Sequence, residues 1–229
     1  MKIKTRLIML LVLLLNPPAF AGIINNGDFQ SCNFDNWQKD TDGAGDLGST
    51  GDFSINNNAG ECSAQISVDL LDDVEVFDAN TLFTALDLSV TSGTLQLSFD
   101  WAFESFDLDD LLSDFFFVSL NDGAGNLFGA DGNNGFLKTP VSTAGTGSFS
   151  VILDPSFYNQ NNWFLDFTLQ AGFNDESYSS KLNIDNVALT TIATEVPEPS
   201  SMAILLLAML GLFAQKYGKS NKEHSNEVL

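Results

Sequence analysis

Histidine and basic residues are almost missing from this chain of 229 residues, and their scarcity excludes several kinds of site. The single histidine, His224, lies close to the C-terminus. Between residues 22 and 199 the only cationic side chains are Lys39, Lys138 and Lys181. A Ser-His or Cys-His catalytic pair and a histidine-ligated zinc site are therefore excluded from this span. Nucleic-acid binding is also disfavoured, because backbone phosphates need cationic partners.

Acidic residues, by contrast, are abundant. Of the 30 acidic residues only Glu223 and Glu227 lie outside residues 22–199, so this span carries 28 carboxylates, three lysines and a net charge of −25. Such a charge disfavours direct binding to anionic lipid or anionic polysaccharide unless divalent cations bridge the two. Two explanations stay open: solubility with mutual repulsion between surface proteins, or Ca²⁺ binding, since carboxylates and carbonyls are the ligands of calcium.

The first 21 residues have the order of a secretory signal peptide. Three cations (Lys2, Lys4, Arg6) precede an apolar run at 7–15, two prolines and the small-x-small sequence Ala19-Phe20-Ala21. The small side chains of Ala19 and Ala21 fit the pocket of signal peptidase, so we expect cleavage after Ala21. The alternative is an uncleaved anchor, but the apolar run is short for a membrane span, which needs about 20 residues.

The chain has only two cysteines, Cys32 and Cys62, and no Cys-x-x-Cys motif for redox chemistry or zinc. Outside the cytoplasm, two thiols in one domain usually pair. We therefore predict a Cys32–Cys62 disulfide. It would close a loop of about 30 residues and stabilise the fold by roughly 3–4 kcal/mol on the chain-entropy account.

A second apolar segment follows the sequence Val196-Pro197-Glu198-Pro199, whose two prolines interrupt any strand or helix. The run from Met202 to Ala214 contains no polar residue, whereas a buried core helix would show some at helical spacing. It is therefore predicted to be a transmembrane helix, although it would rise only about 20 Å. Three lysines follow it, which favours a cytoplasmic C-terminus and places residues 22–199 outside the cytoplasm.

This order of Pro-Glu-Pro, apolar helix and basic residues at the C-terminus resembles the PEP-CTERM sorting signal. The resemblance covers Val196 to about Lys219, with scattered lysines where the family has a dense arginine cluster. It implies processing by an exosortase, in a Gram-negative bacterium that makes exopolysaccharide. The expected route is export as an inner-membrane-anchored precursor, then the cell surface, the outer membrane or the extracellular matrix.

The span between the two ends lacks long stretches of helical periodicity, and several segments alternate between apolar and polar residues. The alternating segments are 95–103, 148–153 and 163–171, and the continuously apolar segment 115–120 predicts a central strand. Turn signals rich in Asn, Asp and Gly separate them. The expected fold is all-β, an antiparallel β-sandwich or jelly roll. Residues 74–88 fit a short helix or an edge strand, and 190–195 fit a linker.

Two short motifs narrow this fold. The opening Asn26-Gly27-Asp28-Phe29 with Trp37, and the closing Ile184-Asp185-Asn186-Val187, resemble the ends of galactose-binding-like jelly rolls. In those modules the first and last strands lie together, and carboxylates with backbone carbonyls often hold a structural Ca²⁺ there. The resemblance makes Asp28 and Asp185 the candidate calcium ligands. The alternative is that Asp28 caps a turn and Asp185 bonds backbone amides. The middle of the chain also resembles exported β domains of the choice-of-anchor type.

These observations divide the chain into five parts. They are a signal peptide at 1–21, a β-sandwich at 22–190, a linker with the Pro-Glu-Pro motif at 191–201, a transmembrane sorting helix at 202–214 and a basic cytoplasmic tail at 215–229.

Three function classes compete for the β-sandwich. The first, which we favour, is a non-catalytic surface or matrix protein associated with exopolysaccharide or biofilm. The second is a carbohydrate-binding module with structural calcium, in which Tyr158 and Tyr178, both in loop-like sequence, would stack on sugar rings of an extracellular polysaccharide. The third is a hydrolase using two carboxylates, for which Asp100 and Glu104 are a possible pair. No catalytic motif supports the third class.

Overall fold

The structure is a computed structural model that describes residues 24–42, 47, 51–68, 79–89, 93–105, 113–172 and 180–192. The chain divides into two compact units, Met1–Ile192 and Ala193–Leu229, and the described residues all belong to the first. The expected signal peptide, sorting motif, transmembrane helix and basic tail lie outside the described residues. Within the described part of the chain, no helix is long and apolar enough to cross a membrane.

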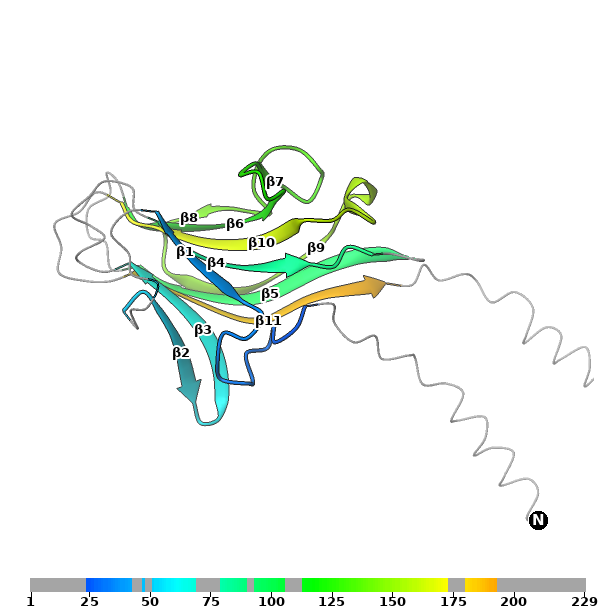
Figure 1. Cartoon of the computed structure of the whole chain (residues 1–229). Coiled ribbons are helices and arrows are strands. Elements are labelled where there is room, and N and C mark those ends of the chain that lie inside the picture. Colours follow the sequence, from blue (N-terminus) through cyan, green and yellow to red (C-terminus); the bar gives the residue numbers. More distant parts are fainter. Residues whose placement is uncertain are drawn as a thin grey trace, which may run out of the picture. The chain divides into compact units, whose positions relative to one another are not determined.

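Two antiparallel sheets form a β-sandwich, as the sequence predicts (Figure 1). The first sheet has the order β1-β4-β10-β6-β7, and β8 also pairs with β6. Its strands are β1 (Gln38–Asp42), β4 (Ala79–Leu86), β10 (Trp163–Gln170), β6 (Phe115–Asn121), β7 (Leu127–Phe128) and β8 (Lys138–Val141). The second sheet has the order β2-β3-β11-β5-β9. Its strands are β2 (Phe53–Asn58), β3 (Glu61–Val68), β11 (Ser180–Ile192), β5 (Thr94–Glu104) and β9 (Gly145–Ile152). A 3-10 turn, η2 (Pro155–Phe157), follows β9.

The core lies between the sheets and is built from the apolar side of each alternating strand. Residues 95, 97, 99 and 103 of β5 face residues 165, 167 and 169 of β10 across it, and all seven are buried. Phe99 and Phe167 meet edge to face with ring centroids 5.0 Å apart, and thereby join the two sheets. Each fully buried Phe or Leu contributes about 1.5–3 kcal/mol by its removal from water.

The segment that fitted either a helix or an edge strand is an interior strand. Within it β4 pairs with β1 on one side and with β10 on the other. Its inward residues Leu82 and Leu86 join the core, and its buried polar residues have backbone partners. Asn80 donates to the carbonyl of Ser67 at 2.7 Å, and the Thr84 hydroxyl donates to the carbonyl of Asn36 at 2.9 Å. These bonds allow polar residues to face the sandwich interior.

The last strand is longer than expected. We placed the end of the sandwich at residue 190, but β11 pairs with β5 as far as Ile192, which is the register partner of Thr94. The expected linker at 190–195 is therefore wrong for its first residues. Gly93 permits this pairing, because a Cβ there would lie 2.3 Å from the carbonyl oxygen of Ile192.

The N-terminal part of the sandwich contacts its last strand, β11, as expected. The contact is made by a turn segment and not by the first strand. Residues 24–37 pack against β11 where its register shifts between Asp185 and Ala188. The Val187 amide donates to the Gly27 carbonyl at 2.8 Å, and a Cβ on Gly27 would lie 1.9 Å from the Val187 oxygen. The first strand, β1, instead pairs with β4 in the other sheet.

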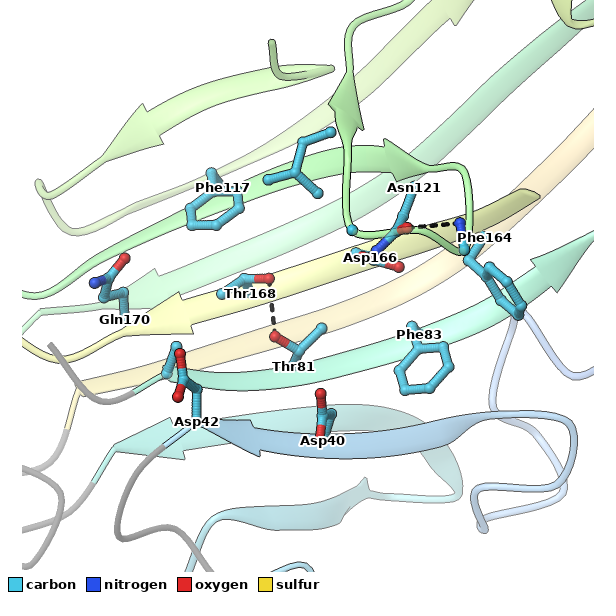
Figure 2. Close-up of a pocket in the computed structure, with 14 residues that line it drawn as sticks. Asp40, Asp42, Thr81, Phe83, Phe117, Asn121, Phe164, Asp166, Thr168 and Gln170 are labelled. Atoms are coloured by element: carbon cyan, nitrogen blue, oxygen red, sulfur yellow. Dashed lines mark hydrogen bonds between the residues drawn. The ribbon is translucent and has the colours of Figure 1, made fainter. Parts of the chain in front are cut away.

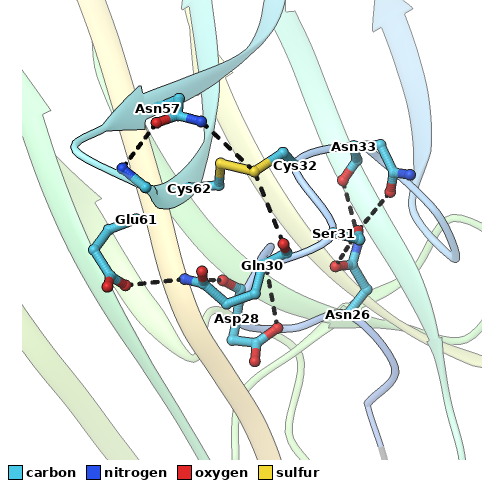
Figure 3. The surroundings of a disulfide bond; sticks show 10 residues. Asn26, Asp28, Gln30, Ser31, Cys32, Asn33, Asn57, Glu61 and Cys62 are labelled. Atoms are coloured by element: carbon cyan, nitrogen blue, oxygen red, sulfur yellow. Dashed lines mark hydrogen bonds between the residues drawn. A yellow bond between two sulfur atoms is a disulfide. The ribbon is translucent and has the colours of Figure 1, made fainter.

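The predicted disulfide is confirmed. Cys32 and Cys62 are bonded, with their Cα atoms 5.4 Å apart, and the described residues contain no free cysteine. The bond ties the N-terminal turn segment to the start of β3 (Figure 3). It therefore holds that segment in place against the second sheet.

Candidate ligand-binding groove

A groove of about 490 Å³ lies on the face of the first sheet that points away from the core (Figure 2). Strands β1, β4, β10 and β6 supply its floor, and residues 123 and 125 of the β6–β7 connection, with residue 127 at the start of β7, supply one wall. Side chains of a strand alternate between the two faces. Because Leu165 and Phe167 point into the core, Phe164, Asp166 and Thr168 necessarily face the groove.

Antiparallel register aligns the groove residues in rows across the sheet. One row consists of Asp40, Thr81, Thr168 and Phe117. The next row consists of Gln38, Phe83, Asp166 and Ser119, of which Phe83 and Asp166 line the groove. At about 3.3 Å per residue, the four groove-facing positions of β10 from Phe164 to Gln170 cover about 20 Å along the strand. The groove thus has the extent of an elongated ligand rather than that of a compact one.

Phenylalanine rings stand at both sides of the groove. Phe83 and Phe164 lie on adjacent strands and meet edge to face, with centroids 5.8 Å apart. Phe117, on β6, packs against Phe136 at 4.8 Å. All three groove rings are half-buried, so each keeps part of its surface open to a ligand. Such surfaces bind apolar C–H faces through dispersion and through the ring quadrupole.

Asp166 lies at the floor of the groove and is only 7% exposed. Asn121 donates to its Oδ2 at 2.8 Å, and no other hydrogen bond reaches this carboxylate from the described residues. Burial raises the pKa of Asp166 from 3.8 to about 6, against the opposing effect of the Asn121 hydrogen bond, and the negative charge of Asp40 adds to the rise. A buried carboxylate therefore faces the groove, and no cationic side chain among the described residues pairs with it.

One pair of hydroxyls belongs to the floor, and another hydroxyl lies beside Asp166 without lining the groove. Thr81 and Thr168 share a hydrogen bond of 3.0 Å between their hydroxyls, which leaves each with further acceptor capacity. Ser119 is fully buried beside Asp166, and its hydroxyl has no hydrogen-bond partner in the described part of the chain. An unsatisfied buried hydroxyl costs about 1–3 kcal/mol, so this row of the sheet is not optimised for stability.

The sequence placed Asp166 and Thr168 on the polar side of a strand, and we did not identify them as site residues. Both are nevertheless buried, because β10 lies between β4 and β6 rather than at a sheet edge. The available signal was an aspartate in the middle of an apolar strand. Aspartate is disfavoured in strands, and a costly residue there points to function.

Of the two tyrosines expected to bind sugar, the structure describes only Tyr158, which does not line the groove. Tyr158 is half-buried against the core, and its hydroxyl is held between the Leu95 amide and the Leu153 carbonyl at 3.1 Å each. Its hydroxyl is therefore used to join two parts of the sandwich, and sugar binding by the Tyr158 ring stays a prediction. Tyr178 lies outside the described residues.

Asp28 and Asp185 do come near one another, at the register shift of β11. Burial raises the pKa of Asp185, an effect opposed by its hydrogen bond from the Asn186 amide, and the nearby carboxylates of Asp100, Asp28 and Glu61 raise it further. These oxygens have the chemistry that calcium prefers. However, no three His, Cys, Asp or Glu side chains converge closely enough to hold a metal ion anywhere in the described residues.

Gln30 further limits a calcium site at this place. Its side-chain amide donates to the Asp28 carbonyl at 3.3 Å and to Glu61 at 3.2 Å, and its backbone amide donates to the Asp28 carboxylate (Figure 3). Asp28 thus also caps a turn, which was the alternative prediction. Calcium binding by Asp28 and Asp185 stays a prediction.

The pair considered for hydrolysis is not arranged for it. Asp100 and Glu104 lie four residues apart on β5, so their Cα atoms are about 13 Å apart at 3.3 Å per residue. Asp100 is held by Ser148 and Asn186, whose hydrogen bonds lower its pKa. Paired glycosidase carboxyls are about 5–9.5 Å apart. Neither residue lines the groove.

Comparison with protein families supports the expectation for the C-terminus. Residues 195–218 match the PEP-CTERM protein-sorting motif, so the chain carries this motif, as predicted from Val196–Pro199. The motif indicates an exported, membrane-anchored precursor of the kind processed by exosortases in Gram-negative bacteria. A search of curated proteins finds no match to the chain.

Among solved structures the chain is similar in fold to β-sandwich carbohydrate-binding modules. One is TmCBM61 in complex with β-1,4-galactotriose, at 12% identity and a TM-score of 0.47, with 75% of this chain and 99% of that chain covered. Another is the mannan-recognising module TmCBM27, at 21% identity and a TM-score of 0.43, with 72% of this chain and 95% of that chain covered. A third is a Caldicellulosiruptor saccharolyticus CBM27-1 in complex with mannohexaose, at 14% identity and a TM-score of 0.43. The similarity covers 70% of this chain and 93% of that chain.

Proposed function

We propose that this protein is an exported, non-catalytic glycan-binding protein, whose groove on the first sheet holds one polysaccharide chain. The observation that carries the proposal is the composition of the groove. Aromatic rings stand at its sides, and hydroxyl, amide and carboxylate groups form its floor. Sugar rings have the complementary surface, because they combine apolar C–H faces with hydroxyl groups that donate and accept hydrogen bonds.

The shape of the groove favours a chain over a single sugar. It is open and extends about 20 Å along β10, by the strand rise of about 3.3 Å per residue. Several sugar units in a row would contact Phe164, Asp166 and Thr168 in turn. Of the residues that the structure describes, Asp40, Asp42 and Asp166 line the groove and no cationic side chain does, which disfavours uronic-acid and sulfated chains.

The sorting motif supports an extracellular location for the sandwich. A protein exported through a PEP-CTERM tail carries its sandwich outside the cytoplasm, where exopolysaccharide accumulates. We therefore extend the proposal to association with extracellular polysaccharide or a biofilm matrix.

The test is a glycan array followed by titration calorimetry on the purified protein. Phe164→Ala should weaken binding of any captured neutral glycan at least about tenfold, since central aromatic contacts contribute more than about 1.4 kcal/mol. Ile152→Ala is the control, because Ile152 is an exposed apolar residue on β9 in the other sheet. Failure of every glycan to bind, or equal losses in both variants, would refute the proposal.

A catalytic alternative has one observation in its favour. The pKa of Asp166 is raised to about 6 beside Asp40, as for a general acid that faces a second carboxylate. Incubation of bound oligosaccharides with the protein distinguishes the two functions. The binding function predicts that their length is unchanged, and release of shorter products that is abolished by Asp166→Asn would establish hydrolysis.

A further inference from the structure

We propose that the groove selects glycans that carry a free, protonated amine, with the ammonium group bound by Asp166. This inference rests on the proposed glycan-binding function and names its ligand class. It predicts that N-unsubstituted amino sugars bind better than the same sugars with acetylated nitrogen.

The position of Asp166 is the first argument. Its carboxylate lines the groove, yet its residue is only 7% exposed, so an ionised oxygen is presented to a ligand from a largely dry floor. Asn121 satisfies Oδ2 and is itself neutral, which leaves acceptor capacity on the carboxylate and no compensation of its charge. A buried charge without a partner is costly, and a ligand cation would offset that cost.

The placement of the lysines is the second argument. The described residues contain three, and each lies away from the groove. Lys39 lies over the rings of Phe34 and Phe53, at 4.3 and 5.2 Å from their centroids. Lys138 lies 4.4 Å from the Trp101 centroid, and Lys181 is on β11 in the second sheet. In the described part of the chain, no cation is therefore available to neutralise Asp166.

The groups around Asp166 strengthen the preference for a cation. Among the described residues, the charged neighbours that face Asp166 come from β1 only; they are Asp40 and Asp42, and both are negative. Strand β4 contributes Phe83, whose ring can also face a cation, and β6 contributes neutral Asn121. An ammonium group with three donors matches the carboxylates of Asp166 and Asp40, whereas an N-acetyl group would bring one donor and no charge.

The experiment is titration of the purified protein with matched oligosaccharides at pH 7. The probes are β-1,4- and β-1,6-linked glucosamine hexamers and their fully N-acetylated counterparts. An amine hexamer of at least one linkage should bind at least tenfold more tightly than its acetylated counterpart. Raising the salt concentration from 0.05 to 0.5 M should reduce this advantage, because ion pairing is screened. Asp166→Asn, which keeps the size of the side chain, should abolish the advantage.

The control is Glu104→Gln, which removes one exposed carboxylate from the end of β5 in the other sheet. It should keep the preference, so a general effect of the acidic surface is distinguished from a local one. Equal or tighter binding of the acetylated hexamers, or a preference that survives Asp166→Asn, overturns the inference. Binding of other, neutral glycans with no binding of either amine hexamer also overturns it, while the proposed function stands. If no glycan binds at all, both fail.

Discussion

Replacing Asp166 with asparagine should make the protein more stable at neutral pH. Burial raises the pKa of this carboxyl from 3.8 to about 6 in the folded state. The stability that the protonated carboxyl contributes is therefore fully present below pH 3.8, and it is lost as the pH rises through about 6 and the carboxyl ionises. At 1.36 kcal/mol for each tenfold change in proton affinity, the loss above pH 6 is about 3 kcal/mol. Asparagine keeps an oxygen that can accept the Asn121 hydrogen bond and carries no charge.

The assay is urea unfolding of wild type and Asp166→Asn at intervals between pH 4 and pH 8. The stability difference should be small at pH 4, should grow in favour of the variant up to about pH 6.5, and should then stay constant. Glu104→Gln controls for the overall negative charge and should show no such rise, because Glu104 is exposed. A difference that does not vary with pH, or a wild type that is the more stable protein at pH 7, would refute the account of Asp166.

Three further predictions concern the rest of the chain. Denatured, non-reduced protein should contain no reactive thiol, and replacing both Cys32 and Cys62 with serine should lower the unfolding free energy by roughly 3–4 kcal/mol; two free thiols in exported material would contradict this. If Asp28 and Asp185 share a calcium ion, chelation should lower the melting temperature, and Ca²⁺ but not Mg²⁺ should restore it. Equal effects of both ions, unchanged in Asp185→Asn, would show simple screening. Mass spectrometry should find a mature N-terminus after Ala21 and, in a host with an exosortase, no segment 202–214; an intact chain in such a host would disprove the processing route.

The strands were predictable where one face of the sheet is buried and the other is not. In 95–103 and 148–153 the alternation survives in the structure, because β5 and β9 pack one side against the core. The segment at 74–88 was ambiguous because polar Asn80 and Thr84 point inward and break the apolar pattern. Their hydrogen bonds to distant backbone carbonyls decide the strand, and one sequence does not show those bonds.

The groove was not predictable as a unit, because its parts come from distant positions. Asp40 and Asp166 lie on strands far apart in sequence, and only the register of β1, β4 and β10 brings them to the same face. A single-residue change in register would move every such side chain to the opposite face. The hydrogen bonds of the Tyr158 hydroxyl were not predictable for a related reason, because the backbone groups that bind it belong to β5 and to the segment after β9.

The two end motifs, by contrast, were informative about proximity. Asn26-Gly27-Asp28-Phe29 and Ile184-Asp185-Asn186-Val187 meet, as the resemblance to galactose-binding-like modules implied. The physical reason is Gly27, whose missing side chain permits the close approach to Val187. The motif order at the C-terminus was recognisable without any structure, because it depends on sequence alone.

The most direct test of the central claim is a crystal structure of the protein with an oligosaccharide that it binds. The account predicts that the sugar chain lies along β10 on the outer face of the first sheet, with rings against Phe83 and Phe164 and a polar group within hydrogen-bond distance of Asp166. A sugar chain bound to the β2-β3-β11-β5-β9 sheet, or at the loops with the groove left empty, would contradict it.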